Sequence, residues 1–138
     1  METVFSELQT LAEKLLTRPC ADTPAGKPQT MYGYIRTERR SPDYRDACAD
    51  LLNWWSASEG WQLGTVFCDR GVGSHVLIRP GFTGLLDVLR LPGAAGVVVV
   101  SGSHLSECAV ISGRLTSTVR RTGSTIRILA DELAEVTV

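Results

Sequence analysis

The sequence predicts an α/β fold: a mainly parallel sheet with helices on both faces, preceded by an N-terminal helix. Two observations support this prediction. Four consecutive valines, Val97 to Val100, do not fit a half-exposed strand, in which apolar and polar residues alternate, and indicate an inner strand buried on both faces. Segments with strand patterns and segments with helix patterns also alternate along the chain, which is typical of parallel strands joined by crossover helices.

The first part of the chain combines a helical pattern with a proline-rich segment. Residues 1–17 have apolar side chains at helical spacing, among them Leu8, Leu11 and Leu15, and predict an amphipathic helix. This helix either packs on its own domain or docks on a partner or a second copy. Residues 18–29 contain prolines and a glycine and indicate a linker. The α/β domain is expected to cover residues 30–138.

The elements of this domain have signals at their ends as well as in their spacing. Ser41-Pro42-Asp43 is a helix start, with a capping serine, a proline at the first position and an acid in the first turn. Gly60 ends that helix, and Pro92 stops the next one. Residues 131–138 form either a partial helix or an edge strand. The expected strands are 30–36, 61–68, the valine strand ending at Val100, and 125–129; the expected helices are 41–60, 80–91 and 105–121.

Composition narrows the classes of function. The 138 residues are 43% hydrophobic and 21% charged with a net charge of −1, so no general attraction to nucleic acid or membrane is expected. No signal peptide or bilayer-spanning run is apparent, and the four cysteines form no CxxC pair, which favours free thiols in the cytoplasm. His104 and Cys108 are spaced as a ligand pair on a helix, but we interpret them as a surface histidine and a core cysteine. No metal or cofactor is expected.

Several motifs resemble a known family. Tyr34-Ile35-Arg36 ends the first strand, Val66-Phe67-Cys68-Asp69 ends the second, and Arg79-Pro80-Gly81-Phe82 starts a helix after the glycine loop 71–74. In this order and spacing, from about Met31 to Leu129, they resemble the catalytic domain of the serine recombinases, the resolvase/invertase family. The resemblance implies a flavodoxin-like, resolvase-like sheet of four to five strands and an origin in DNA strand exchange.

The resemblance also implies where the family's chemistry would lie. In that family a serine hydroxyl attacks a DNA phosphodiester without a metal, and arginines stabilise the charge on the phosphate. The nucleophile position is Glu38 in this sequence, and the other catalytic positions are Ser103, His104 and Glu107. A carboxylate cannot replace the serine and repels a phosphate. Ser41 lies three residues further on and is not expected to substitute.

Two arginines of the family's cluster remain. Arg36 and Arg79 are the candidate residues for binding phosphate or another anion. Family members continue into a long helix and a DNA-binding domain, whereas this sequence ends at Val138; if the protein itself ends there, we expect neither extension. Four further arginines are candidates for a basic patch: Arg114, Arg120, Arg121 and Arg127.

Three functions from different classes follow. The first is a catalytically inactive pseudoenzyme that serves as a protein-interaction or regulatory module, with a protein partner or a homodimer formed through the N-terminal helix and the helix of Trp54. The second is a DNA recombination accessory that binds DNA weakly through Arg36 and Arg79. The third is an enzyme of another chemistry, with Glu38, His104 and Glu107 as acid and base groups. Arginine, alanine and glycine usage suggests a bacterial source.

Overall fold

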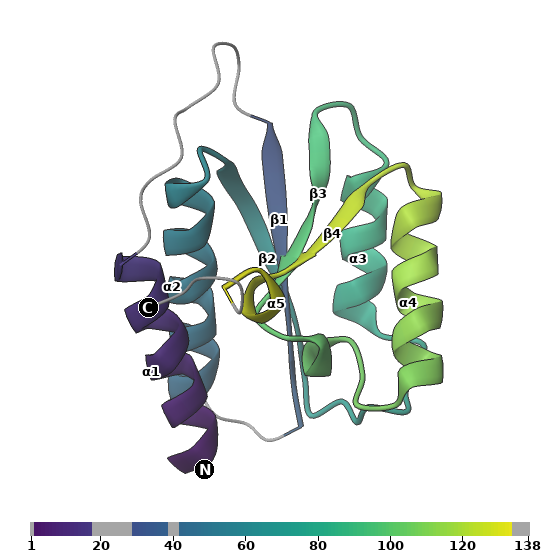
Figure 1. Cartoon of the computed structure of the whole chain (residues 1–138). Coiled ribbons are helices and arrows are strands. Elements are labelled where there is room, and N and C mark those ends of the chain that lie inside the picture. Colours follow the sequence, from purple (N-terminus) through teal and green to yellow (C-terminus); the bar gives the residue numbers. More distant parts are fainter. Residues whose placement is uncertain (1, 18–28, 39–41, 134–138) are drawn as a thin grey trace.

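Helices and strands alternate along the chain as the sequence predicts. The computed structural model describes residues 2–17, 29–38 and 42–133. Helices α2, α3 and α4 join four strands in turn, and a short 3-10 turn, η1, precedes α4 (Figure 1). The bounds are α1 Glu2–Thr17, β1 Thr30–Thr37, α2 Pro42–Ser58, β2 Gln62–Arg70, α3 Pro80–Leu89, β3 Ala94–Val99, η1 Gly102–His104, α4 Ala109–Arg121, β4 Thr125–Ile128 and α5 Leu129–Leu133.

The sheet winds in two directions from its first strand. All of its strand pairs are parallel, in the order β2-β1-β3-β4, which confirms the predicted fold class. The chain passes from β1 outward to β2, returns past β1 to β3, and continues to β4. The winding direction therefore reverses between β1 and β3. In open α/β sheets, ligands bind at the carboxyl ends of the strands beside such a reversal.

The valine strand is buried on both faces, as its sequence predicts. Helices α1, α2 and α5 lie on one side of the sheet, and α3 and α4 lie on the other (Figure 1). Val98 and Val100 pack in the core on the first side, whereas Val97 and Val99 pack in the core on the second. Each fully buried valine contributes about 1.5–3 kcal/mol relative to an exposed one. The strand therefore stabilises both layers at once.

The N-terminal helix packs on the chain's own sheet domain. Leu8, Leu11 and Leu15 are buried and share a core cluster with Leu51 and Leu129. This apolar face is the stripe that the sequence shows, and α2 and α5 cover it. Of the two roles predicted for this helix, the structure shows the packed one. Among the helices that the structure describes, none combines the length and apolar character that crossing a bilayer requires.

Two segments differ from the prediction. The helix expected over 105–121 begins only at Ala109, because residues 102–104 form η1. The Ser106 hydroxyl accepts a hydrogen bond from the Cys108 N–H at 2.9 Å and donates one to the Ser74 carbonyl at 2.8 Å. A serine side chain that takes local backbone groups in this way competes with helix formation. At the C-terminal end, α5 is a short helix, and residues 134–138 lie outside the described part.

Candidate functional site at the strand ends

The candidate residues lie where the winding reverses. Arg36 stands at the carboxyl end of β1, directly opposite Asp69 of β2 in the strand register. Ser103 and His104 lie in η1, which follows β3. Four parallel strands thus bring segments far apart in the sequence to one edge of the sheet. This edge is where an open α/β sheet holds a ligand.

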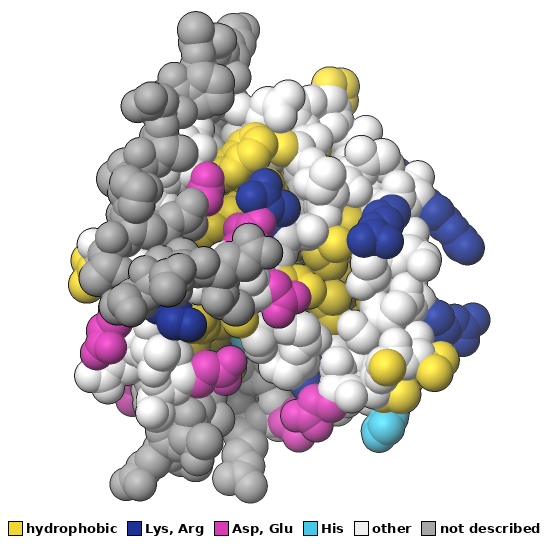
Figure 2. Space-filling view, viewed as in Figure 1, with side chains coloured by type: hydrophobic (Ala, Val, Ile, Leu, Met, Phe, Trp, Pro, Cys, Tyr) yellow, Lys and Arg dark blue, Asp and Glu magenta, His cyan; other side chains and the backbone are white. Residues whose placement is uncertain are grey.

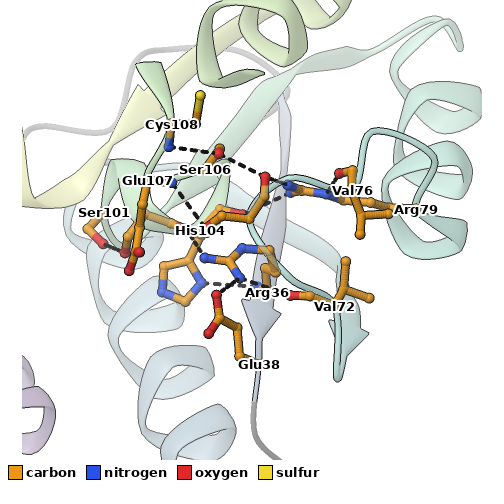
Figure 3. Close-up of polar contacts among 12 residues, drawn as sticks. Arg36, Glu38, Val72, Val76, Arg79, Ser101, His104, Ser106, Glu107 and Cys108 are labelled. Carbon is orange, nitrogen blue, oxygen red and sulfur yellow. Dashed lines mark hydrogen bonds and ion pairs between the residues drawn. The ribbon is translucent and has the colours of Figure 1, made fainter. Parts of the chain in front are cut away.

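The Arg36 guanidinium is enclosed by groups of the protein itself. Its Nη1 donates to Glu38 Oε1 at 3.1 Å and to the Val72 carbonyl at 2.9 Å, and its Nη2 donates to the Ser103 carbonyl at 2.6 Å (Figure 3). The Arg36 side chain is 5% exposed, whereas the Glu38 side chain is 56% exposed. Arg36 Nε is buried and has no hydrogen-bond partner among the described residues. The exposed Glu38 carboxylate therefore neutralises the positive charge of the buried Arg36 guanidinium.

His104 is a buried structural residue rather than the surface histidine that the sequence suggested. Its Nδ1 accepts a hydrogen bond from the Arg36 backbone N–H at 3.0 Å, so the neutral ring carries its proton on Nε2. Burial and the nearby Arg36 charge lower the pKa of His104 to about 4. The predicted core position of Cys108 is also wrong, since Cys108 is half-buried at the start of α4. His104 is buried because it lies in the 3-10 turn η1, which directs its imidazole inward.

The other ring nitrogen of His104 faces α2. His104 Nε2 lies 3.2 Å from the Tyr44 hydroxyl and 4.0 Å from Cys48 Sγ. The Tyr44 and His104 rings are stacked, with an interplanar angle of 8°. Burial raises the pKa of both neighbours, that of Cys48 to about 12. Each of these groups is thus held neutral, and neither nitrogen of the histidine is left for a substrate.

Arg79 clamps the loop between β2 and α3 against η1. Arg79 is buried and donates to the carbonyls of Val76 at 2.7 Å, Ser74 at 3.2 Å and His104 at 3.4 Å. Its Nη1 also lies 3.5 Å from the Tyr34 hydroxyl. The Arg79 guanidinium thus directs its donors to four neutral groups of the protein. The second candidate anion-binding residue therefore organises the backbone around it (Figure 3).

Asp69 caps the helix that follows this loop. Its carboxylate accepts hydrogen bonds from the N–H groups of Gly81 at 2.7 Å and Phe82 at 3.0 Å, and from the Tyr34 hydroxyl at 2.8 Å. A negative charge is favourable at a helix N-terminus. Burial and Asp69 raise the pKa of Tyr34. A Cβ on Gly81 would lie 2.7 Å from the Cys68 carbonyl oxygen, so glycine permits this close approach. Asp69 belongs to the motif at the end of the second strand, but no feature of the sequence indicates Tyr34 as its partner.

The comparisons with known proteins support one fold. The sequence matches no protein-family model and no curated protein. The N-terminal catalytic domain of TP901-1 integrase matches with a TM-score of 0.67 and 18% identity, over 75% of this chain and 79% of that one. The C-terminal catalytic domain of ISC1926 TnpA, an IS607-like serine recombinase, gives 0.65 and 13%, over 72% and 70%. A serine recombinase from Sulfolobus solfataricus gives 0.51 and 19%, over 75% and 69%.

This chain has the fold of a serine recombinase catalytic domain. The resemblance seen in the sequence is therefore confirmed at the level of fold. In this serine recombinase-like domain, the position expected for the nucleophile holds Glu38 in contact with Arg36. Of the three other family positions, Ser103 and Glu107 are exposed and His104 is buried. Ser41 lies outside the described residues.

The remaining candidates are distributed over the serine recombinase-like domain. Cys48, Cys68 and Cys108 are free thiols, and Cys20 lies outside the described part. Within that part, no group of three or more His, Cys, Asp or Glu side chains is arranged to hold a metal ion. The four arginines proposed as one basic patch do not lie together. Three are exposed on α4, whereas Arg127 lies 5.3 Å from the centre of the Trp55 ring and pairs with Glu132.

Proposed function

We propose that this serine recombinase-like domain does not cleave DNA and acts as a protein-interaction or regulatory module. The observation that carries the proposal is the ion pair between Glu38 and Arg36. In the family's chemistry, the phosphate and the attacking hydroxyl meet beside this arginine. In this chain a carboxylate stands at that position and already binds the guanidinium.

Electrostatics shows how strongly Glu38 opposes the reaction. Two like unit charges about 4 Å apart repel by about 1 kcal/mol in water and about 4 kcal/mol near a protein surface. Every 1.4 kcal/mol corresponds to about a tenfold change in rate. The same site also lacks a hydroxyl at position 38, and His104 and Glu107 stand at the two positions where the family has arginines. Each missing charged donor costs several kcal/mol of transition-state stabilisation.

The contacts of Arg79 and His104 also support this proposal. Arg79 donates to neutral groups of the protein, and its side chain is buried. His104 has one ring nitrogen on the Arg36 N–H and the other beside Tyr44 and Cys48. An enzyme of another chemistry that uses His104 as a base would need one of these nitrogens free. These contacts favour a structural role for the residues of the former site.

The experiment looks for a covalent bond between protein and DNA. The native chain is incubated with supercoiled plasmid and with a labelled duplex, and products are analysed by denaturing gel and peptide mass spectrometry. We expect no nucleotide attached to any serine. A serine peptide carrying a nucleotide, whether from Ser41 or elsewhere, would refute the proposal. Binding of inorganic phosphate is measured in parallel by NMR of the arginine Nε–H groups.

Matched variants test the role of the ion pair itself. Glu38→Gln removes the carboxylate from Arg36, and we expect phosphate to bind at least about tenfold more tightly than to the native chain. Glu107→Gln is the control, since it removes an exposed carboxylate nearby and leaves the Glu38–Arg36 pair in place. Equal phosphate affinity of the native chain and Glu38→Gln would show that Glu38 does not oppose phosphate binding at Arg36.

A weak nucleic-acid accessory role is the second candidate. The observation that favours it is Arg36 Nε at the strand ends, which is buried and has no hydrogen-bond partner within the described part of the chain. A protein that binds through phosphate contacts loses affinity steeply as salt rises. Titration of a mixed-sequence duplex at two salt concentrations tests this role. A steep salt slope that Arg36→Gln abolishes would support it over the interaction module.

A further inference from the structure

The two helical layers of the domain carry opposite charge. Helix α2 bears Asp43, Asp46 and Asp50 against Arg45, whereas α4 bears three arginines and no acidic residue. These helices cover opposite sides of the sheet (Figure 1). Positive and negative charges are therefore separated across the domain, although the net charge of the chain is only −1. In Figure 2, basic side chains line the α4 side, whereas acidic side chains lie over the middle of the view and on the α1 side, with a few basic side chains among them.

An apolar groove lies between α1 and α2. It has a volume of about 340 Å³, and its lining includes Leu8, Ala12, Ala47, Leu51 and Trp54. Asp50 is the charged side chain among the described residues that line it. Trp54 lines this groove and is 49% exposed. A half-exposed indole beside an apolar groove is a typical anchor for a protein partner.

The outer face of α4 has the complementary properties. A shallow hollow there is lined by Val110, Gly113 and Ser117, and by two arginines, Arg114 and Arg121. Val110 is 72% exposed. No acidic side chain lines this hollow among the described residues, and a Cβ at Gly113 would meet no atom within 4 Å. The face thus offers small and apolar residues between two cations.

We propose that a second copy of this chain docks its α1–α2 groove on the α4 face, with Trp54 seated at Gly113 and Ser117. Asp50 then faces Arg114 and Arg121 across the contact. This inference rests on the proposed interaction function and names the partner. The two surfaces differ and lie on opposite sides of the sheet, so the contact is head-to-tail and each copy binds two others.

The observations favour a second copy over DNA as the occupant of the α4 face. Phosphates would pair with the arginines, but they offer nothing to the exposed Val110 side chain. Nor does DNA account for the apolar α1–α2 groove with its half-exposed indole and its acidic side chain, Asp50. One chain that carries both halves of a charge-complementary pair accounts for all of these features.

Sedimentation velocity of the full chain at increasing concentration tests the proposal. We expect the average mass to rise with concentration and to fall when salt is added, since the charges are exposed. The variant Arg114→Glu/Arg121→Glu and the variant Asp46→Lys/Asp50→Lys should each be monomeric. Mixed in equal amounts, they should associate again, because each retains one intact face. Arg114→Lys/Arg121→Lys keeps the charge and should retain association.

A steric variant separates docking from general charge effects. Gly113→Leu adds a bulky side chain to the exposed hollow, at a position where an added Cβ meets no atom within 4 Å. The fold should therefore persist by circular dichroism, while self-association weakens by at least about tenfold. In the native chain, association should also shift the Trp54 fluorescence to the blue. Trp54→Phe identifies that signal.

Several outcomes would overturn the inference. A native chain that stays monomeric at millimolar concentration, or charge variants that associate alone or fail to associate when mixed, would do so. Duplex DNA binding that Arg114→Glu/Arg121→Glu abolishes, with the mass of the native chain unchanged, would identify the α4 face as a nucleic-acid surface instead. None of these results involves covalent attachment to DNA, so the proposed lack of cleavage is tested separately.

Discussion

The backbone N–H of Arg36 donates a hydrogen bond to Nδ1 of His104 at 3.0 Å, and this bond joins the end of β1 to the turn after β3. The bond requires an unprotonated Nδ1, because a backbone N–H can only donate. The same arginine places its positive guanidinium beside the ring and donates to the Ser103 carbonyl. A proton on Nδ1 would break the bond and add a second positive charge.

Stability should therefore depend on pH through His104. Its folded pKa of about 4 lies below the ordinary value of 6.5, so the unfolded chain binds more protons between these two values. The free energy of unfolding should fall as pH is lowered from about 6.5 to about 4, by roughly 3 kcal/mol at most for this group. Urea unfolding followed at intervals across this range measures the slope.

The variant His104→Asn tests whether His104 causes this pH dependence of the free energy of unfolding. His104→Asn keeps an acceptor near the position of Nδ1 but has no titrating ring. We expect it to be less stable at neutral pH and to lose part of the pH dependence. Parallel slopes for the native chain and His104→Asn would show that the histidine does not titrate as proposed.

Arg79 should be among the residues least tolerant of substitution. Its buried guanidinium satisfies carbonyls of Ser74, Val76 and His104, which would otherwise be left without these donors. Arg79→Lys replaces the planar guanidinium and its several donors with a single ammonium group. We expect the free energy of unfolding, measured in urea, to fall by about 2–4 kcal/mol. Arg90→Lys is the matched control, since Arg90 is exposed and its pair with Asp87 contributes little. Similar losses for both variants would contradict the clamp role.

The fold could be predicted from the sequence because its strongest signals are local. Consecutive valines, helical spacing and glycine or proline stops each act within a few residues. The failure at residues 105–108 has the same origin, because Leu105 and Cys108 fit a helical pattern by spacing alone. What interrupts the helix is Ser106, whose hydroxyl bonds to Ser74.

The site was harder to predict because its contacts are long-range and involve the backbone. The family pattern located Arg36 and Arg79, but their acceptors are carbonyls of loops, which no side-chain pattern reveals. His104 meets the Arg36 N–H across 68 positions in the sequence. Its burial could not be seen in a polar turn, where histidine is commonly exposed.

Cys48 should resist alkylation in the folded chain. Burial raises the pKa of its thiol to about 12, and only the thiolate reacts readily. Cys108, half-buried at the start of α4, is the internal comparison. Iodoacetamide labelling at pH 8 followed by peptide mass spectrometry should modify Cys108 well before Cys48, and urea should remove the difference. Early labelling of Cys48 in the native chain would mean that α2 opens from the sheet.

Two glycines in helices should respond in opposite directions to the same substitution. At Gly81 an added methyl would lie 2.7 Å from the Cys68 carbonyl oxygen and 2.9 Å from the Asp69 carboxylate oxygens. The backbone must shift, and the cap of α3 with it, so we expect Gly81→Ala to lower the free energy of unfolding by about 1–3 kcal/mol. At Gly113 the space is open, and Gly113→Ala should raise it by about 1 kcal/mol through helix propensity. Urea unfolding of the two variants measures both effects in one experiment. A stabilising Gly81→Ala would mean that α3 does not approach β2 as closely as the carboxylate cap requires.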